Sequence, residues 1–588
     1  MDLVWILVLL PIVASAALVS ITSERVHYYL CSAVLILSGG TALTLYGSPE
    51  IFTFHLSSVA EGGIVVADVL LLLYFAYQGV KFKSRMVMIL AVMQLLLYLF
   101  AKLISPVETA PEIVVDTLSK FMFLIINIVG GIIILFSIRY MKDESADPFK
   151  KRVFIAGLLF FLSVMNAIVC ADSMLLFFLL FEMTTLSSYL LIAFRNDEIS
   201  RSNALRALWM NQIGGVVILL GALVAISGFD TLSISELLEH SGQMVVLSVA
   251  LLSMAALVKG ASIPFDGWLL GAMVAPTPVS AMLHSATMVK IAPYLILKLS
   301  PALGGTLLGE FLSVIGASVF VAASYLALSR FVFKEILGYS TIALLGLMIS
   351  LAAIGTESSI SIAMVLILFH ALSKALLFLA AGVLEKQYHV KSIEEMKGMI
   401  QRAPKTVGYI VFGFVSLTLP PFGLFMGKLF AITSVTSILH ERPWLLIVLL
   451  GMIVGSVLLV LLYFKVASAL LSHPSDTVLT KREHLPFGYH IPLILLSFLI
   501  LFTAVGYTLV QNDRLLALFA LPLLIVFLLP IMIRAMERYD RIQPYHCGEK
   551  ESFDAALVYF EPSVFTQRLI YWGFGAMFVA LLLAGALS

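Results

Sequence analysis

Six ionisable side chains lie inside stretches of sequence that are otherwise apolar. They are Glu182 in LLFFLLFEMTTLSSYLL, Lys259 in LSMAALVKGASIPF, Lys290 in LHSATMVKIAPYL, His370 and Lys374 in LILFHALSKALLFLAAG, and Lys428 in PPFGLFMGKLFAI. Burial favours the neutral form of a carboxyl group or an amine, whereas a nearby opposite charge favours the ionised form. Side chains in such surroundings gain and lose protons as their neighbours change. The pattern therefore predicts a proton relay.

The apolar surroundings make these charges costly. An ionised side chain at the centre of a membrane helix costs about 2.5–3.5 kcal/mol, so Glu182 and the four lysines would together cost about 12–17 kcal/mol if unpaired. They must face water, face one another or give up their charge. His370 and Lys374 are four residues apart and share one helix face, and a histidine exchanges protons near neutral pH.

Other polar residues have plainer explanations. His284 and Lys334 are possible relay members, but a lone histidine is often hydrogen-bonded structure. Lys334 stands at a predicted helix start, where the positive-inside rule alone explains a basic residue. Lys428 could instead snorkel from a helix end, because lysine has a long stem. Asp68 and Lys102 occur in two successive apolar stretches and are expected to pair structurally.

The elements that carry these residues are predicted to be membrane helices. Of 588 residues, 61% are hydrophobic and 12% are charged, with a mean hydropathy of +1.06. So few charges cannot cover a soluble enzyme of this size, and the hydrophobicity excludes disorder. A net charge of +1 provides no basic excess for nucleic acid. Three scattered cysteines cannot hold a metal cluster alone. We predict an all-α polytopic membrane protein.

About 18 stretches are apolar and long enough to cross a membrane as helices, since a crossing needs about 20 residues. They are 3–21, 26–46, 63–80, 86–104, 119–138, 152–170, 173–194, 207–227, 244–275, 280–299, 309–329, 335–354, 358–385, 406–433, 444–466, 488–510, 515–533 and 567–587. The first resembles a signal peptide without a basic start, and we expect it to be retained. Lysine and arginine gather in alternate loops, which places those loops in the cytoplasm and the N-terminus outside.

Two predicted spans contain helix breakers. The stretch 244–275 contains Pro264, and the stretch 406–433 contains Pro420 followed by a second proline. Proline removes a backbone donor and clashes with the preceding turn, so each helix should break there. A broken helix at membrane depth is tolerated where it is buried in protein or lines a wet cavity.

The positions of the breaks predict an internal repeat. Each broken helix is the fourth of five spans, in 152–299 and in 309–466. Because five is odd, the second set enters the membrane from the opposite side, which gives two inverted five-helix repeats as in many transporters. The remaining regions would be N-terminal helices in 1–118 with an apparent two-helix insertion, a helix and basic loop in 119–151, and C-terminal helices in 467–588.

Five segments resemble, in order, those of the antiporter-like, proton-conducting membrane subunits. The segments are LLFFLLFEMTTLSSYLLI, LVKGASIPFDGWLLGAMVAPTPVSAMLHSATMVKIAPYLI, KEILGYSTIALLG, FHALSKALLFLAAG and LPPFGLFMGKLF, within about 119–466. That family includes large membrane subunits of respiratory complex I, Mrp-type sodium/proton antiporters and energy-converting membrane-bound hydrogenases. Five motifs in register make the resemblance highly specific.

The resemblance implies roles for the matching positions. Glu182 would pair with Lys259 on the first broken helix, and Lys290 would be the next relay residue. The central relay of the second repeat and its terminal residue would be, in order, His370, Lys374 and Lys428. Redox chemistry in partner subunits, or an opposing ion gradient, would drive the movement of protons or sodium.

Two features set the chain apart from many members. Asp266 stands where they have the histidine of a His-x-Trp-Leu motif, and GWLLGAM with the late segment YHCGEKESFD looks more like the hydrogenase and formate-hydrogenlyase branch. We therefore predict an ion-translocating subunit of a redox-driven, hydrogenase-like complex in a prokaryotic plasma membrane. The alternative is a subunit of an Mrp-type sodium/proton antiporter without a redox partner.

The chain carries no flavin, nickel or iron–sulfur motif, and we expect no cofactor or metal on it. Nickel–iron and iron–sulfur centres would reside in partner subunits, both peripheral redox subunits and further membrane subunits. A scaffold whose ion path is inactive is a third possibility. The sequence leaves open the choice between proton and sodium, the direction of transport and the terminal redox reaction.

Overall fold

The computed structural model describes residues 2–105, 111–472, 483, 485–511 and 562–587. Within these residues, sixteen helices are long and apolar enough to cross a membrane, and α11 (Gln243–Lys259) is a shorter apolar helix. Together they account for every predicted span that lies in the described residues, which confirms the polytopic helical fold. The predicted span 515–533 and the segment YHCGEKESFD lie outside the described residues.

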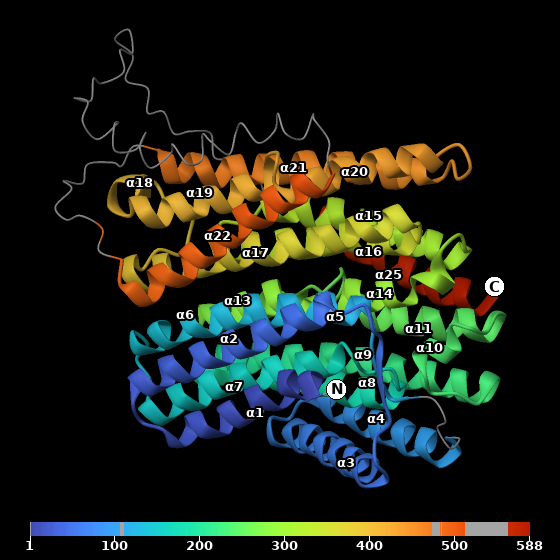
Figure 1. Ribbon diagram of the computed structural model, residues 1–588. Coiled ribbons are helices and arrows are strands. Elements are labelled where there is room, and N and C mark those ends of the chain that lie inside the picture. The colour runs from blue at the N-terminus through green and yellow to red at the C-terminus, as the bar shows by residue number, and fades with distance from the viewer. Residues whose placement is uncertain (1, 106–110, 473–482, 484, 512–561, 588) are drawn as a thin grey trace.

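The helices run side by side, with α3 and α4 at one edge of the bundle and α20 and α21 at the other (Figure 1). The first four are α1 (Asp2–Ser20), α2 (Glu24–Gly47), α3 (Ser58–Lys81) and α4 (Arg85–Ile104). The next span consists of α5 (Thr117–Leu124), the π-helical segment η1 (Ile125–Val129) and α6 (Gly130–Lys142). The ends of the helices near Arg25, Lys142 and Arg195 mark what we call the basic side.

The first five-span set is interrupted twice. Its helices are α7 (Pro148–Ile168), α8 (Met174–Ile192), α9 (Glu198–Phe229), α10 (Ile234–Leu237), α11, α12 (Gly267–Gly271), α13 (Thr277–Ala281) and α14 (Ile291–Leu303). Short turns connect some of them: η2 (Ala193–Arg195), η3 (Ala272–Val274), η4 (Met282–Ala286) and η5 (Met288–Lys290). The break after Lys259 was predicted, whereas the interruption of the span 280–299 was not.

The second set has one break, at the predicted place. Its helices are α15 (Leu307–Leu328), α16 (Phe333–Ile354), α17 (Glu357–Tyr388), α18 (Met399–Arg402), α19 (Pro404–Thr418), α20 (Gly423–Ile438) and α21 (Leu445–Leu471). The chain is irregular between α19 and α20, where the two prolines remove backbone donors. The broken helix is thus the fourth of the five spans in both sets.

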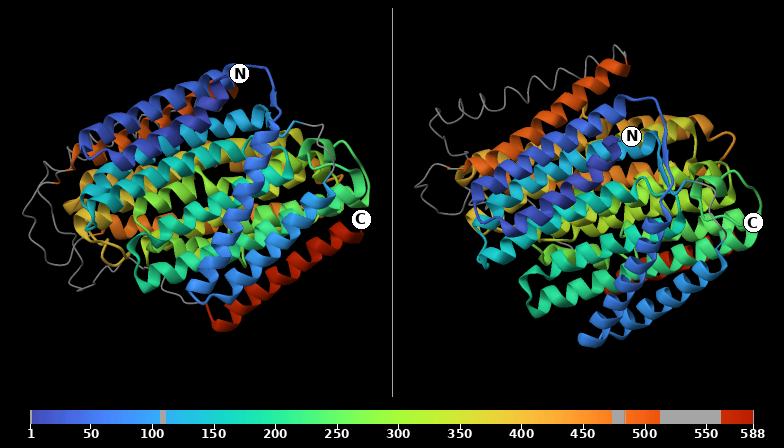
Figure 2. Two further views of the ribbon diagram at one scale, coloured as in Figure 1. Left: turned by 90° about the horizontal axis from the view of Figure 1, so that it is seen from below. Right: turned by 60° about the horizontal axis from the view of Figure 1, so that its bottom comes forward.

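The last two described helices return along the bundle. They are α22 (Phe487–Gln511) and α25 (Val564–Leu587). Helix α25 packs on α11 and α15 at the outside of the bundle, as the red helix in Figure 2 shows. Its Tyr571 hydroxyl donates to Asp266 Oδ2 at 2.8 Å, so the C-terminal helix contacts the connection that follows the first break.

Local signals in the sequence explain where several helices begin. Asp147 accepts hydrogen bonds from the backbone N–H groups of Phe149 and Lys150, and Pro148 occupies the first turn of α7. Asp197 caps α9 in the same way, and Thr356 caps α17 in a capping box. Such caps satisfy backbone donors that have no partner within the helix.

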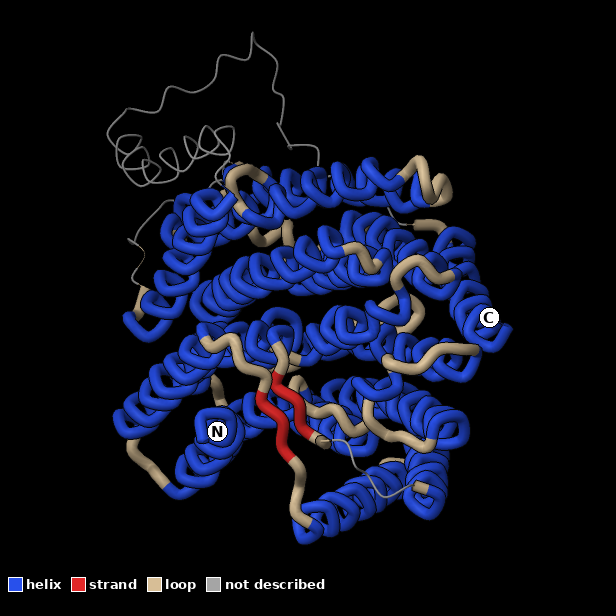
Figure 3. The backbone as a smooth tube through the Cα atoms, turned by 45° about the vertical axis from the view of Figure 1, so that its right-hand side comes forward, coloured by secondary structure: helices blue, strands red, loops and turns tan. Residues whose placement is uncertain are grey.

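Two short strands at the end opposite the basic side were not predicted. Strand β1 (Phe52–Phe54) and β2 (Ile113–Val115) pair antiparallel, with Phe52 opposite Val115. They lie in the connections between helices (Figure 3). Pairing provides hydrogen-bond partners for the backbone N–H and C=O groups of two extended segments, one between α2 and α3 and one between α4 and α5. It does not alter the all-helical character of the spans.

The two five-span sets share a detail at opposite ends. An isolated bridge joins Ser173, before the second helix of the first set, to Ser233, after the third. The second set has the corresponding bridge between Val332 and Ser392. Because successive spans alternate in direction, the first bridge lies away from the basic side and the second lies on it. This arrangement is the one expected of an inverted repeat.

A buried ion pair reinforces the first of these bridges. Lys298 Nζ lies 2.9 Å from Asp172 Oδ1, and Ser233 and Ser235 donate to the same carboxylate at 2.5 and 2.6 Å. Burial alone would raise the pKa of Asp172, but Lys298 and the two serines outweigh it and hold that pKa below its ordinary value. The cluster ties the α7–α8 loop to α10 and α14.

We expect Asp172→Asn to lower the stability of the chain by about 3–5 kcal/mol, because it leaves the Lys298 ammonium buried without its counter-charge. Since the pKa of Asp172 is depressed, the wild type has this stabilisation above the unfolded-state pKa of about 3.9 and loses it as pH falls through the folded-state value. The variant lacks this acid dependence. The measurement is the thermal unfolding midpoint in detergent at several pH values.

The matched control is Asp230→Asn, an exposed aspartate at the end of α9. It should leave the midpoint and its pH dependence nearly unchanged. Equal midpoints for Asp172→Asn and the wild type would contradict the role of this pair.

Candidate functional site

All six side chains predicted to form the relay are buried in the bundle. The exposed fraction is 7% for Lys428 and 0% for the other five. They come from α8, α11, η5, α17 and α20, and thus from both five-span sets. Burial of so many ionisable groups inside membrane helices is costly, so each must find solvating or neutralising partners within the bundle.

Glu182 accepts a hydrogen bond from Gln94 of α4, which is itself anchored to α9. Gln94 Nε2 donates to Glu182 Oε1 and to the carbonyl of Gln212, both at 2.8 Å. Gly215 makes room for this arrangement, because a Cβ there would lie 2.0 Å from Glu182 Oε1. Sequence reasoning missed Gln94, although a glutamine in an apolar stretch is the same kind of signal as the charges that were singled out.

Lys259 is the last residue of α11, where the helix breaks. Its Nζ donates to the carbonyl of Phe181 at 3.0 Å and to Thr185 Oγ1 at 2.9 Å, and it lies 3.8 Å from the centre of the Phe181 ring. These two partners flank Glu182 on α8. Among the described residues, Glu182 and Lys259 form no direct ion pair, so the lysine is solvated by neutral groups beside the carboxyl group.

Lys290 and His370 form a hydrogen bond between Nζ and Nδ1. They lie 80 residues apart and belong to different five-span sets. Lys290 reaches the histidine because the predicted continuous span 280–299 is interrupted at Thr287, whose backbone has φ −129° and ψ −109°. The Thr287 hydroxyl donates to the carbonyl of Met282 at 2.7 Å, which competes with regular helix formation.

Lys374 lies one turn beyond His370 on α17. Its Nζ donates to the carbonyl of Leu337 at 3.1 Å and contacts Ser340 Oγ. His284 lies against the Phe378 ring of the same helix, 4.8 Å between ring centres, and neither of its ring nitrogens has a hydrogen-bond partner in the described part of the chain. The structure therefore places His284 against α17, near His370 and Lys374.

Lys428 points back across the second helix break. Its Nζ lies 3.5 Å from the carbonyl of Leu417, in the last turn of α19. Ser416 donates to Ser373 at 2.7 Å, so a pair of hydroxyls lies between the neighbours of Lys428 and Lys374. The amine is directed into the bundle, and the geometry does not resemble that of a lysine snorkelling to the surface.

Lys334 belongs to a separate cluster at the basic side. Its Nζ lies 2.5 Å from Glu385 Oε2, which also accepts a hydrogen bond from Thr277 at 2.7 Å. Lys386 pairs with Glu144 close by. Sequence reasoning missed the two glutamates because each lies near a helix end, where a charge is expected to be solvated.

Asp68 does not pair with Lys102, contrary to the prediction. Asp68 is fully buried, whereas Lys102 is exposed. The two residues are on different helices of the pair α3–α4, and an apolar stretch contains no information on which face its helix turns inward.

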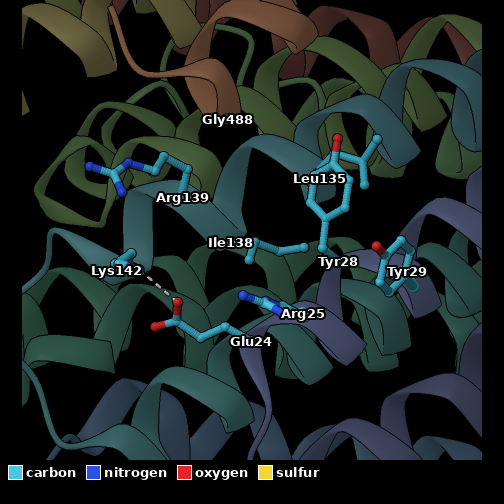
Figure 4. Close-up of a pocket in the computed structure, with 9 residues that line it drawn as sticks. All are labelled: Glu24, Arg25, Tyr28, Tyr29, Leu135, Ile138, Arg139, Lys142 and Gly488. Atoms are coloured by element: carbon cyan, nitrogen blue, oxygen red, sulfur yellow. Dashed lines mark hydrogen bonds and ion pairs between the residues drawn. The ribbon is translucent and has the colours of Figure 1, made fainter.

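A surface hollow at the basic side lies apart from these residues. It measures about 270 Å³ and is lined by Glu24, Arg25, Tyr28, Arg139 and Lys142, among others (Figure 4). Lys142 Nζ and Glu24 Oε2 form an exposed ion pair there at 2.9 Å. None of the six buried relay candidates lines it.

Two family models match the chain. The one described as NADH:quinone oxidoreductase/Mrp antiporter, TM, matches residues 171–459. The one described as NADH-ubiquinone oxidoreductase (complex I), chain 5 N-terminus, matches residues 104–152. All six buried candidates lie within the first match.

Curated relatives and solved structures agree with these matches. A subunit of the Na(+)/H(+) antiporter of Alkalihalophilus pseudofirmus is 30% identical over 437 residues, which cover 68% of this chain and 53% of the relative. The antiporter subunit mnhA2 of Staphylococcus aureus is 28% identical over 413 residues, covering 66% and 51%. The chain thus spans about half the length of these relatives.

Two solved complexes share the fold. The structure of the membrane-bound sulfane sulfur reductase, an archaeal respiratory membrane complex, aligns with a TM-score of 0.69 at 18% identity over 87% of this chain and 96% of that chain. The Mrp complex from Dietzia sp. DQ12-45-1b aligns with a TM-score of 0.67 at 16% identity over 87% and 95%.

We expect Gly423→Ala to destabilise the chain by about 1–3 kcal/mol, a typical cost of overpacking a core. Gly423 begins α20, and a Cβ there would lie 1.9 Å from the buried ring of Phe369, next to His370. The thermal unfolding midpoint in detergent measures the effect. Gly408→Ala is the control, because a Cβ at that position of α19 meets nothing within 4 Å. Equal midpoints for the two variants would contradict the close packing at the second break.

Proposed function

We propose that this chain, which belongs to the antiporter-like family of membrane subunits shared by NADH:quinone oxidoreductase and Mrp antiporters, carries protons or sodium ions across a prokaryotic plasma membrane. The observation that carries the proposal is the hydrogen bond between Lys290 and His370. It joins buried groups of the first five-span set to those of the second. The proposed order is Glu182, Lys259, Lys290, His370, Lys374 and Lys428.

The partners of the lysines support transfer along this row. Lys259, Lys374 and Lys428 donate to backbone carbonyls, which stabilise an ammonium without a fixed negative charge. Loss of a proton from Lys374 or Lys428 therefore leaves no carboxylate unpaired beside it. In a low-dielectric interior, a charge at one position strongly affects the charge at the next. A change at Glu182 and Lys259 would thus favour release further along the row.

The hydroxyl groups near the row offer places for proton transfer between the amines. Thr185 contacts Lys259, Ser340 contacts Lys374, and Ser373 with Ser416 lies towards Lys428. Buried hydroxyls of this kind also bind ordered water. The cluster of Lys334, Glu385 and Thr277 is proposed as the approach from the basic side.

A hollow near α20 is the proposed opening on the other side. It measures about 470 Å³ and lies between α17, α20 and α22. Its polar lining consists of Ser358, Ser361, Thr433, Ser434, Ser437 and Tyr507. Thr433 follows Lys428 by five residues, or about 7.5 Å along the helix. We place the basic side in the cytoplasm and the N-terminus outside, on the distribution of basic loops.

Replacement of Lys259 with Met tests the relay, because the methionine stem fills similar space without a titratable group. We expect translocation measured in vesicles to fall by about 10²-fold or more, as for the loss of an essential proton-transfer group. Assembly, measured as the amount of chain in the purified complex, should persist. Unchanged translocation would refute the relay assignment.

The control for this substitution is Lys102→Met, which removes an exposed lysine from the end of α4. It should translocate at the wild-type rate. If Lys259→Met lost assembly and translocation in equal proportion, a scaffold role would explain the result and the relay would be rejected.

We further propose that a redox-driven, hydrogenase-like complex contains this subunit, with nickel–iron and iron–sulfur centres in partner subunits. The fold shared with a respiratory membrane complex supports this proposal. The similarity to sodium/proton antiporter subunits favours the alternative, an Mrp-type assembly driven by an ion gradient. Both assignments use the same buried residues, so the site does not separate them.

Purification in mild detergent separates the two assignments. The redox proposal predicts co-purifying peripheral subunits that contain nickel and iron, detected by metal analysis and mass spectrometry of the intact complex. The alternative predicts further membrane subunits without redox metals, together with sodium/proton exchange in vesicles that lack any electron donor. The second outcome would reject the hydrogenase-like assignment while leaving ion translocation in place.

A further inference from the structure

Helices α3 and α4 turn a polar face into the bundle and an apolar face outward. Asp68 and Gln94 are fully buried, whereas Leu70 and Leu96 are 62% and 63% exposed. The pair lies at the edge of the bundle in Figures 1 and 2. The family matches begin at residue 104 and leave almost all of this pair outside. Its inward face therefore needs its own explanation.

The carboxyl group of Asp68 lies deep in this face. Neither of its oxygens has a hydrogen-bond partner of normal geometry among the described residues, and no lysine or arginine of the described chain pairs with it. The Tyr98 hydroxyl and the Glu182 carboxyl group are close enough to influence its charge. An isolated ionised carboxylate in this position would be very costly, so the group is best accommodated with a proton.

Gln94 connects this face to Glu182. Its side-chain nitrogen donates to Glu182 Oε1 and to the carbonyl of Gln212, which fixes the orientation of the amide. Tyr98, one turn along α4, stacks on Phe178 of α8 with 6.0 Å between ring centres. Asp68 is midway along α3, as Glu182 is along α8. Four neighbouring helices thus place their polar groups at one depth.

We propose that Asp68 is a further proton-carrying residue, which exchanges its proton with Glu182 and thereby sets the charge beside Lys259. In this step a proton leaves the Asp68 carboxyl group and arrives on the Glu182 carboxylate, so one negative charge moves from Glu182 to Asp68. The Tyr98 hydroxyl and water carry the proton, and Gln94 positions the receiving oxygen. The inference rests on the proposed function of the buried row.

The residues of α3 beyond Asp68 indicate whether a proton could travel along this helix to the surface. Towards the basic side, the next buried polar residue of α3 is Gln78, which accepts a hydrogen bond from Tyr189 at 3.2 Å. The buried residues Leu71, Leu72 and Phe75 fill the face between Asp68 and Gln78, a distance of about 15 Å along the helix. Asp68 therefore stores and returns a proton to Glu182, and does not form an open route to the surface along α3.

The test compares Asp68→Asn, Asp68→Glu and Glu61→Gln in the whole complex. Asn keeps the size but cannot exchange a proton, and we expect translocation to fall at least several-fold with the amount of assembled complex unchanged. Glu restores a carboxyl group and should recover most of the rate. Glu61 is exposed on the same helix, so Glu61→Gln should retain the wild-type rate.

Infrared difference spectra with and without an imposed pH gradient give a second readout, which a purely structural role would not change. The wild type should show a protonated-carboxyl band that is absent in Asp68→Asn and present in Glu61→Gln. If Asp68→Asn reduces assembly, Tyr98→Phe serves instead, since it removes one hydroxyl and should also slow translocation.

A parallel Glu182→Gln variant separates this inference from the proposed function. Loss of translocation in Glu182→Gln with a wild-type rate and an unchanged carboxyl band in Asp68→Asn would overturn the role of Asp68 alone. Wild-type rates in both variants would overturn the relay as well. Loss in Asp68→Asn without rescue by Asp68→Glu would also count against proton exchange at this position.

Discussion

The cost of an ionised amine in the membrane interior is the constraint on which the rest of the structure depends. An ammonium needs hydrogen-bond acceptors, and in hydrocarbon it cannot obtain them from water. The four mid-span lysines obtain them from uncharged groups. Their acceptors are the carbonyls of Phe181, Leu337 and Leu417 and the ring of His370.

Lysines near the ends of the spans have carboxylate partners instead. Lys298 lies 2.9 Å from Asp172, and Lys334 lies 2.5 Å from Glu385. A carboxylate partner favours the charged form of an amine strongly. A carbonyl or imidazole stabilises the ammonium less than a carboxylate does. In the proposed function, the choice of partner distinguishes the relay lysines from the lysines that fix loops.

Irregular backbone supplies several of these positions. Lys259 ends α11 at the first break, and Lys428 faces the carbonyl of Leu417 across the second. The unexpected interruption at Thr287 turns Lys290 towards His370. A continuous helix bonds its own carbonyls internally and presents side chains at fixed intervals. Breaks free acceptors and redirect side chains at the depth where water is scarce.

The sequence predicted both proline-containing breaks and the burial of the relay candidates, because a charged residue within some 18 apolar neighbours has few other places to lie. It could not predict the contact of Lys290 with His370, which joins residues 80 positions apart through tertiary packing.

The placement of Asp68 bears on why α3 and α4 pack against α8 and α9 at the edge of the bundle. Its partner was predicted wrongly because the exposed Lys102 and the buried Asp68 differ in helix face, which one apolar stretch does not reveal. Glu182 is on α8, and without α4 its carboxyl group would lose the hydrogen bond from Gln94. The uncharged amide of Gln94 would be enough to satisfy that oxygen of Glu182. The buried carboxyl group of Asp68, with no cation of the described chain paired with it, adds a free-energy cost that a helix pair serving only to hydrogen-bond Glu182 would not need. A cost of this kind in a membrane interior is explained most simply by proton exchange, because the group is tolerated when protonated and useful when it releases the proton.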